Sequence, residues 1–171
     1  MNRLAHPGVD DVLGLLKPSQ FRMRRHAALG KPIGSAAEFA QAIGVDLDRI
    51  AKTIVVGRRG WPPQRRIAEP LAAYAAVCLS SLRKINLAAV AQTFAWPGCE
   101  LATTAELAKL LGVSRGCVSP LGLGQIPLVV DESLFPHGTV LVGGGAGIDI
   151  ELAPRDLVRV TNAMVMSIAV D

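Results

Sequence analysis

The feature that most constrains the fold of this chain is a run rich in glycine and proline, SRGCVSPLGLG at 114–124. A proline inside a helix costs about 3 kcal/mol, because it lacks the amide hydrogen, and each glycine costs about 1 kcal/mol relative to alanine. A helix through Gly116 and Pro120 would therefore lose most of the stability margin of a small domain. The sequence predicts a loop here.

The segment before this loop offers a competing interpretation. TTAELAKLLG at 103–112 is a capped helix and Ser114 could cap a second one, which is the spacing of a helix-turn-helix DNA-binding regulator. That second helix would have to cross the glycines and the proline, and only Arg115 and Gln125 could reach a base edge. DNA is therefore not an expected partner. A continuous helix over 115–124 would revive this interpretation.

A second glycine-rich segment, VGGGAG at 142–147, joins two predicted strands. It lacks the following helix of a dinucleotide-binding fingerprint and the Gly-Lys-Ser/Thr end of a phosphate-binding loop. Two interpretations stay open for both glycine segments. They are tight turns between strands, or they form a cradle whose backbone N–H groups closely approach a ligand.

Capping residues and hydrophobic periodicity predict helices and strands in an irregular order. Predicted helices cover 9–17, 35–44, 47–51, 87–94, 103–112 and 154–161; predicted strands cover 53–57, 71–80, 127–131, 139–144 and 147–152; 163–169 is a strand or a helix. A basic loop rich in proline and glycine is expected between the first two strands. This order predicts a mixed α+β domain rather than a doubly wound sheet.

Length and composition are those of a globular protein. The 171 residues, half of them hydrophobic, fit a single domain over 1–171, with 1–20 as a helical extension. The longest apolar run, 71–79, is too short to span a bilayer, and Asp10 and Asp11 interrupt any signal-like segment. Three cysteines without a C-x-x-C pair predict neither a disulfide framework nor a zinc site. We expect a cytoplasmic protein with no membrane partner.

Positive charge is concentrated in the first half of the chain. Residues 1–85 contain 14 of the 18 lysines and arginines but 6 of the 14 acidic residues, which predicts a basic face for a polyanion. The densest runs are QFRMRRH at 20–26 and GRRGWPPQRR at 57–66. A solvated surface and a long loop are the alternative explanation of these runs. Trp61 could stack on a base or cover a sheet edge.

Three segments, in order along the chain, resemble the signature blocks of the YbaK/prolyl-tRNA-synthetase-associated domain family. They are IAKTIVV at 50–56, RGCVSPLGLGQIPLVVD at 115–131 and VLVGGGAGIDIELAPRDLVRV at 140–160, with a weaker likeness over 25–45. The resemblance implies a mixed, partly barrel-like β-sheet flanked by helices. It also implies a free-standing deacylase that hydrolyses the ester between tRNA and a wrong, small amino acid such as Ala, Cys or Ser.

The resemblance also assigns candidate residues, with Lys52 in the place of the family's functional lysine. By resemblance, Thr53, Gly116, Pro120, Gly122 and Asp149 also fall on family positions. With the residues beside them, the candidate set is Lys52, Gly116, Cys117 and Val118 for catalysis and Thr53, Ser119, Pro120, Gly122, Gly143, Gly144 and Asp149 for substrate binding. The basic runs add Arg24, Arg25, Arg58 and Arg59 as candidates for tRNA binding. The chain departs from the family pattern at two of these positions. Gly143 stands where many members have a small hydroxyl residue, and Cys117 where many have a second glycine.

Ester hydrolysis needs a nucleophile, donors for the developing oxyanion and an anchor for the substrate. The histidines His6, His26 and His137 are spread along the chain, so no Ser-His-Asp set is expected, and each is interpreted as a surface or structural residue. Backbone N–H groups at 116–118 are expected to bind the oxyanion. Lys52 would hold the acyl carbonyl or the terminal phosphate as a compact charge.

Several alternatives stay open for the chemistry. The nucleophile is a water, a ribose hydroxyl or the Cys117 thiol, for which no paired histidine is identifiable. Asp149 either orients a substrate amine or caps a strand. No cofactor or metal is expected, and the expected partners are tRNA and an aminoacyl-tRNA synthetase. The alternative function is a non-catalytic module of the same fold that binds tRNA or an aminoacyl ligand.

Overall fold

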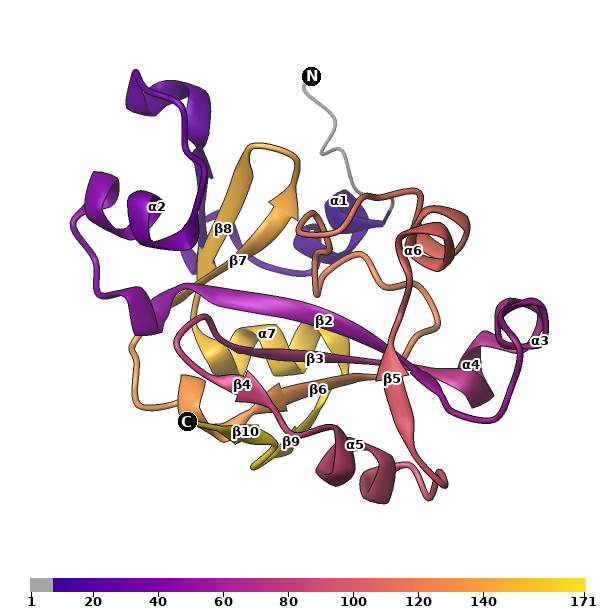
Figure 1. The fold of residues 1–171 in the computed structure, drawn as a ribbon. Coiled ribbons are helices and arrows are strands. Elements are labelled where there is room, and N and C mark those ends of the chain that lie inside the picture. The colour runs from indigo at the N-terminus through magenta and orange to yellow at the C-terminus, as the bar shows by residue number, and fades with distance from the viewer. Residues whose placement is uncertain (1–7) are drawn as a thin grey trace.

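The computed structural model describes residues 8–171 and has the mixed α+β fold that the sequence predicts (Figure 1). A five-stranded sheet crosses the molecule in the order β5-β2-β3-β6-β9. Its strands are β2 (Ala51–Arg58), β3 (Tyr74–Ser80), β5 (Cys99–Leu101), β6 (Leu128–Asp131) and β9 (Met164–Met166). The pairs of β2 with β3 and β5 are antiparallel, whereas β6 is parallel to both β3 and β9. The sheet is therefore mixed.

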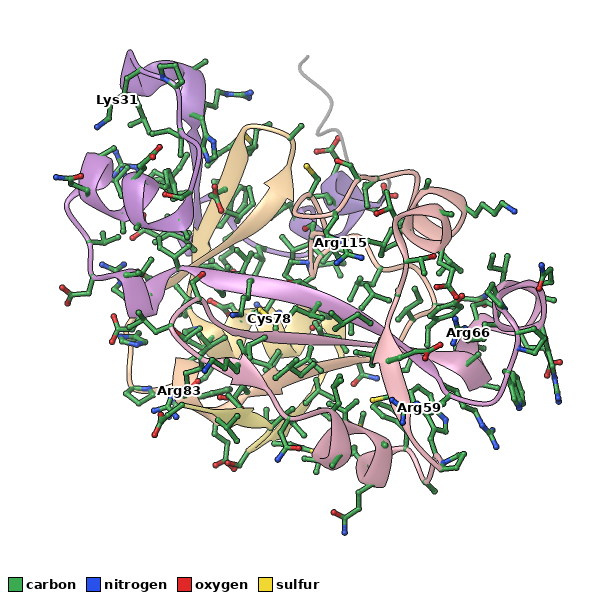
Figure 2. The ribbon with its side chains drawn as sticks, viewed as in Figure 1. Lys31, Arg59, Arg66, Cys78, Arg83 and Arg115 are labelled. Atoms are coloured by element: carbon green, nitrogen blue, oxygen red, sulfur yellow. The ribbon has the colours of Figure 1, made fainter. Side chains whose placement is uncertain are left out.

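The central strand β3 explains why this sheet forms. All seven of its residues are buried, and its sequence YAAVCLS is an apolar run without polar alternation, as expected for a strand covered on both faces. Helix α5 covers one face, and the glycine-rich loop with α1, α6 and α7 covers the other. Figure 2 shows Cys78 within this interior, and burial raises the pKa of its thiol to about 12. Cys78 is therefore a core residue.

A second, smaller sheet is antiparallel and has the order β1-β8-β7. Its strands are β1 (Phe21–Arg25), β7 (Val140–Gly145) and β8 (Ile148–Leu152). A parallel bridge between Ile50 and Leu141 joins it to the larger sheet just before β2 begins. A short ribbon, β4 (Lys84–Ile85) with β10 (Ala169–Val170), completes the strands. Across residues 8–171 the sheets do not close into a barrel.

The helices follow the capping signals of the sequence. Their bounds are α1 (Val9–Leu13), α2 (Ala36–Ile43), α3 (Pro63–Ala68), α4 (Pro70–Ala73), α5 (Leu87–Thr93), α6 (Thr104–Leu111) and α7 (Pro154–Thr161). The hydroxyl groups of Ser35 and Thr103 accept the backbone N–H groups three residues on, which begins α2 and α6. Both helices end at a glycine in the left-handed conformation, Gly44 and Gly112.

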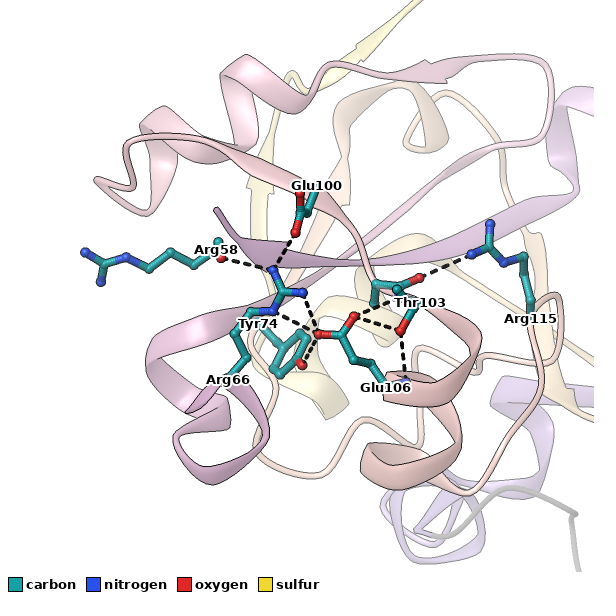
Figure 3. Close-up of polar contacts among 8 residues, drawn as sticks. Arg58, Arg66, Tyr74, Glu100, Thr103, Glu106 and Arg115 are labelled. Atoms are coloured by element: carbon teal, nitrogen blue, oxygen red, sulfur yellow. Dashed lines mark hydrogen bonds and ion pairs between the residues drawn. The ribbon is translucent and has the colours of Figure 1, made fainter. Parts of the chain in front are cut away.

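A buried ion cluster ties α3 and α6 to the sheet at the far end of β2 (Figure 3). The Arg66 guanidinium donates to Glu106 at 2.8 Å and to Glu100 at 2.8 Å, and the Tyr74 hydroxyl donates to Glu106 at 2.6 Å. The backbone N–H of Thr103 donates to the second Glu106 oxygen at 2.8 Å. Burial opposes ionisation of Glu106, but these hydrogen bonds outweigh it and lower its pKa.

Most predicted elements are confirmed, and four predictions differ from the structure. The expected loop between the first two strands contains α3 and α4, which each begin with a proline, so the strand predicted at 71–80 begins only at Tyr74. The predicted helix at 9–17 ends at Leu13. The final segment is two short strands rather than one continuous element. The loop over 115–124 contains no helix, which removes the support for a DNA-binding regulator.

Candidate active site

A cavity of about 330 Å³ lies between the two sheets, where β2 begins. Its walls come from the turn after β1, the start of α2, the first residues of β2, the glycine-rich loop and the β7–β8 pair. Six residues that the sequence singled out line this cavity together: Lys52, Thr53, Gly116, Val118, Gly143 and Asp149. With His26, which also lines it, the cavity brings together residues up to 123 positions apart in the chain.

Lys52 and Thr53 lie at the end of β2 that has no β5 partner, because β5 pairs only with Val56–Arg58. The Lys52 ammonium lies 3.5 Å from the carbonyl oxygen of Ser81, and burial lowers its pKa. The Thr53 hydroxyl oxygen is buried and has no hydrogen-bond partner among the described residues. That oxygen lies beside the thiol of Cys78, its neighbour on β3, and has no exposed surface, so Lys52 is the group of the two that is available to a bound ligand.

The glycine-rich loop reaches the cavity through Gly116 and Val118. Gly116 has a φ of 86°, a left-handed conformation that other residues rarely adopt. The backbone N–H of Cys117 is occupied by the Ser114 carbonyl at 3.1 Å. Among the described residues no acceptor is found for the N–H groups of Gly116 and Val118, so the two loop residues that line the cavity each have a main-chain donor without a protein partner.

Gly143 holds the loop and the smaller sheet close together. A Cβ atom at this position would lie 3.1 Å from the carbonyl oxygen of Val118, tighter than an ordinary contact. Glycine therefore allows β7 to approach the loop at the place where many family members carry a hydroxyl residue. The departure at Gly143 has a packing explanation, because the Val118 carbonyl leaves little room for a side chain here.

Asp149 on β8 and His26 after β1 form a polar pair in the cavity wall. The Nε2 atom of His26 lies 2.6 Å from Oδ2 of Asp149, with side-chain exposures of 27% and 14%. Burial raises the pKa of Asp149, against the opposing effect of the contact with His26. The His26 ring also packs on Phe39, at 4.7 Å between ring centroids. Asp149 therefore faces the cavity with its carboxylate held by an imidazole.

His26 is the site residue that sequence reasoning missed, since it was interpreted as surface or structural. Its partner is 123 positions away, and only the antiparallel pairing of β1 with β8 brings the two together. His137 pairs with Asp48 at 3.4 Å and lines no part of this cavity, and His6 lies outside the described residues. The signal available in the sequence was that His26 ends the basic run QFRMRRH at 20–26.

Other predicted residues support the site without lining it. Cys117 is half-buried near Ser114, at 3.5 Å between sulfur and hydroxyl oxygen. Ser119 is fully buried and its hydroxyl accepts the N–H of Leu121, which fixes the turn. Pro120 and Gly122 line a separate hollow near α1, and Gly144 faces the core under Ile150. The structure thus does not bring these five residues into the cavity wall.

The four arginines predicted to contact tRNA fall in two places. Arg24 and Arg25 lie on β1, and Arg24 is held by Glu151 at 2.7 Å, so its charge is already paired. Arg58 and Arg59 lie at the opposite end of β2 from Lys52. The structure therefore does not bring the two pairs together.

Comparison with known proteins agrees with this arrangement. The model of the aminoacyl-tRNA editing domain family matches residues 30–160, which include every lining residue of the cavity except His26. The chain therefore belongs to the aminoacyl-tRNA editing domain family, and the resemblance found in the sequence is confirmed.

Two curated relatives and two solved structures are similar to this chain. A protein of Enterococcus faecalis provisionally named Cys-tRNA(Pro)/Cys-tRNA(Cys) deacylase EbsC is 27% identical over 131 residues, 75% of this chain and 73% of that protein. A proline–tRNA ligase of Chlamydia trachomatis is 34% identical over 88 residues, 52% of this chain but 14% of the ligase.

The two solved structures support the fold. One is described as a trans-editing enzyme for prolyl-tRNA synthetase, a provisional description, with a TM-score of 0.76, 22% identity and 95% coverage of both chains. The other is a hypothetical protein, APE2540, with a TM-score of 0.77, 26% identity and coverage of 95% of this chain and 99% of that one. Within residues 8–171 of the present chain, no helix combines the length and apolar character needed to cross a membrane.

Proposed function

We propose that this chain is an aminoacyl-tRNA deacylase that acts in trans, as a free-standing single domain of the cytoplasm. It would hydrolyse the ester between the terminal adenosine of a mischarged tRNA and its amino acid. The observation that carries the proposal is the convergence of Lys52, Thr53, the free N–H groups of the glycine-rich loop and Asp149 on one cavity. Membership of the editing-domain family supports the same activity.

The proposed reaction adds water across the ester. The oxygen of a water, activated directly or through the neighbouring ribose hydroxyl, bonds to the acyl carbon, and the carbonyl oxygen becomes an oxyanion. The N–H groups of Gly116 and Val118 are the donors that would stabilise this charge. The carbon–oxygen bond to the ribose then breaks, and the ribose oxygen takes the proton that the water lost. The products are the free amino acid and uncharged tRNA.

Lys52 and Asp149 are proposed to hold the two ends of the aminoacyl-adenosine. The Lys52 ammonium would anchor the acyl carbonyl or a terminal phosphate, because its nearest protein acceptor is only a backbone carbonyl. Asp149 would accept the α-ammonium group, with His26 fixing the orientation of the carboxylate. Both groups can form further hydrogen bonds to a substrate, because Lys52 has one weak protein acceptor and Asp149 one protein partner in the structure.

A small side chain is the proposed specificity. Ile33 and Phe39 form an apolar wall, and Thr53 lines the same cavity with its hydroxyl buried in the wall. A rotation of the Thr53 side chain would turn this hydroxyl toward a substrate that can hydrogen-bond to it, so cysteine or serine is preferred over alanine. The relative named as a Cys-tRNA deacylase supports this choice. Editing is useful here because a synthetase separates amino acids differing by one methylene only about 10–200-fold.

The test is a deacylation panel with tRNA charged with Ala, Ser, Cys or Pro. Wild type is compared with Lys52→Ala and with Thr53→Val, which keeps the shape of the side chain and removes its hydroxyl. We expect release of one or two small amino acids by wild type and none by Lys52→Ala. Thr53→Val is expected to reduce the preference for Cys and Ser over Ala. Full turnover in Lys52→Ala would contradict the mechanism.

A non-catalytic binding module remains the second candidate, because Cys117 departs from the family pattern in the loop. This alternative predicts salt-dependent binding of tRNA with ester cleavage no faster than in buffer. A synthetase would then be the partner that supplies the chemistry. Measuring release and binding on the same tRNA samples separates the two candidates.

A further inference from the structure

Both tryptophans of the chain lie at the end of β2 that is farthest from Lys52. Trp61 follows Arg59 in the turn after β2, and Trp96 lies between α5 and β5. In Figure 1 this end carries α3, α5 and β5, away from α2 and the cavity, and Figure 2 shows Arg59 next to β5. Large aromatic side chains therefore lie next to arginines on a surface that is separate from the candidate active site.

A groove of about 500 Å³ separates α5 from the segment that leads into β5. Arg59, Gln92 and Trp96 supply the polar and aromatic groups of its lining. Trp96 stacks on Phe94 with 5.0 Å between ring centroids, which fixes the plane of the indole ring. The thiol of Cys99 donates to the Leu87 carbonyl at 3.1 Å, so it closes the groove floor and is not a free nucleophile.

The backbone that presents Trp96 is held in an unusual conformation. Ala95 has a φ of 53°, in the left-handed region that costs a residue with a Cβ about 1–2 kcal/mol. The next N–H, that of Trp96, is bonded to the Ala91 carbonyl at 2.8 Å. Strain of this kind persists where surrounding structure enforces it, and here its effect is to place an indole ring beside an arginine.

Two arginines of this surface, Arg58 and Arg59, have no ion pair among the described residues, whereas Arg65 is paired with Glu69. Arg58 and Arg65 lie over the Trp61 ring, at 4.7 and 3.6 Å from its centroid. Arg59 is exposed and forms no ion pair with the described residues. The acidic neighbours are already paired, Glu69 with Arg65 and Glu100 with Arg66, and no carboxylate is found among the described residues that line the groove.

We propose that this surface, formed by Arg58, Arg59, Arg65, Gln92 and Trp96, is a second RNA-binding site that holds the backbone of the acceptor arm of tRNA. Seven residues of extended chain separate Lys52 from Arg59, a span of about 23 Å at about 3.3 Å per residue. A strand of stacked nucleotides covers that distance in about seven steps of about 3.4 Å. With the terminal adenosine in the cavity, the groove therefore meets the double-stranded part of the arm.

The contacts proposed here are to phosphate and sugar. Arginines bind phosphate oxygens, the amide of Gln92 can bond to a phosphate or ribose oxygen, and the Trp96 ring packs against a sugar face. Such contacts position the RNA without reading its sequence. The inference rests on the proposed function for the place of the adenosine, but the RNA site itself can be tested without any ester cleavage.

The experiment measures binding of two uncharged RNAs to the full chain, unfractionated tRNA and the tetranucleotide ACCA. ACCA spans about 10 Å in three steps of about 3.4 Å and cannot reach from the cavity to Arg59. We expect Arg59→Glu to weaken tRNA binding tenfold or more and to leave ACCA binding as in wild type. Arg59→Ala should reduce the slope of log affinity against log salt by about 1.

The matched control is Arg155→Glu, the same change at an exposed arginine of α7. Trp96→Phe should bind tRNA nearly as wild type and Trp96→Ala severalfold more weakly, with melting temperatures reported for both. Equal losses in Arg59→Glu and Arg155→Glu, or unchanged tRNA binding in Arg59→Glu, would overturn the proposal. Unchanged RNA binding together with loss of a protein partner would assign the surface to that partner instead.

The outcome is separable from that of the proposed function. A wild type that binds tRNA through Arg59 but releases no amino acid keeps the RNA site and refutes the deacylase. A wild type that deacylates, with an Arg59→Glu variant of unchanged KM for charged tRNA, keeps the deacylase and refutes the RNA site.

Discussion

Charged side chains at the two ends of β2 differ in whether they are paired with an opposite charge. At the end near α3, Arg66 and Glu106 are 3% and 1% exposed and satisfy each other together with Tyr74 and Glu100. At the end near α2, Lys52 has only a carbonyl oxygen at 3.5 Å. One end uses its charges to hold elements together, whereas the other leaves them available to a ligand.

The difference shows that the polar groups without a strong partner lie at the cavity end of β2. Burying an ion pair is roughly neutral when every group is hydrogen-bonded, and removing one partner is then expensive. Leaving Lys52 half-buried without a carboxylate, and the Thr53 hydroxyl without a partner, contributes nothing to stability by itself. Such groups mark a functional site more reliably than a count of charges does.

The largest expected effect is on stability at the ion cluster. Glu106→Ala leaves the Arg66 charge buried without its main partner, so we expect a loss of about 3–5 kcal/mol in the free energy of unfolding. Denaturant unfolding measures this value. The control is Glu100→Ala, whose carboxylate is half exposed and should cost less than about 1 kcal/mol. Equal, small losses in both variants would remove the contrast between the two ends.

The corresponding substitution at the cavity is expected to change activity without a loss of stability. Lys52→Ala is expected to lower the deacylation rate by a factor of about 10²–10³ or more, as removal of one charge-stabilising donor does in other hydrolases. Its unfolding free energy should equal that of wild type or exceed it, because a half-buried ammonium is removed. A large loss of stability in this variant would show that Lys52, like Arg66, stabilises the fold.

A smaller effect is expected in the glycine-rich loop. Gly116→Ala introduces a Cβ at a φ of 86°, which costs about 1–2 kcal/mol in stability or shifts the loop. Because Gly116 lines the cavity and its N–H has no acceptor among the described residues, we expect the deacylation rate to fall about tenfold while Kd for tRNA is unchanged. Gly124→Ala, also at a positive φ but outside the cavity, is the matched control. An equal loss of rate there would refute a role for the loop donors.

The smallest expected difference between the two ends of β2 is in how stability and activity depend on pH. The lowered pKa of Glu106 means that its contribution to stability is complete above its unfolded pKa and is lost as the pH falls through the folded value, so acid should destabilise wild type more than Glu106→Gln. At the cavity, burial lowers the pKa of Lys52 below 10.5, so deacylation should decline at alkaline pH earlier than an ordinary lysine would allow. In Lys52→Arg any residual activity should keep its rate to higher pH.

The sequence predicted the elements whose signals are local. Capping by Ser35 and Thr103, the apolar run of β3 and the glycine-proline loop all fix their structure within a few residues. The helices α3 and α4 were missed although Pro63 and Pro70 stand at first helical positions, because arginine-rich composition was taken as the mark of a loop.

Long-range pairing was the part that the sequence could not provide. The strand β1 was taken as a basic surface run, although Phe21 and Met23 alternate with arginines as a half-buried strand requires. Its pairing with β8 aligns Arg24 with Asp149 and brings His26 to the carboxylate. The sequence thus predicted the lysine, the glycine-rich loop and the aspartate of the candidate site. It missed His26, because that residue joins the site only through the pairing of two strands that are distant in sequence.

The position of the cavity at the junction of two sheets has a consequence for how such a protein changes its preference over time. The sheets are joined near the site by the bridge between Ile50 and Leu141, and Gly143 sets how closely the smaller sheet approaches the loop. A substitution in the β7–β8 pair can therefore widen or narrow the space for a side chain while Lys52 stays fixed on the other sheet. Because Lys52 and Gly143 lie on different sheets, we expect substitutions in the β7–β8 pair to alter substrate preference before they displace Lys52.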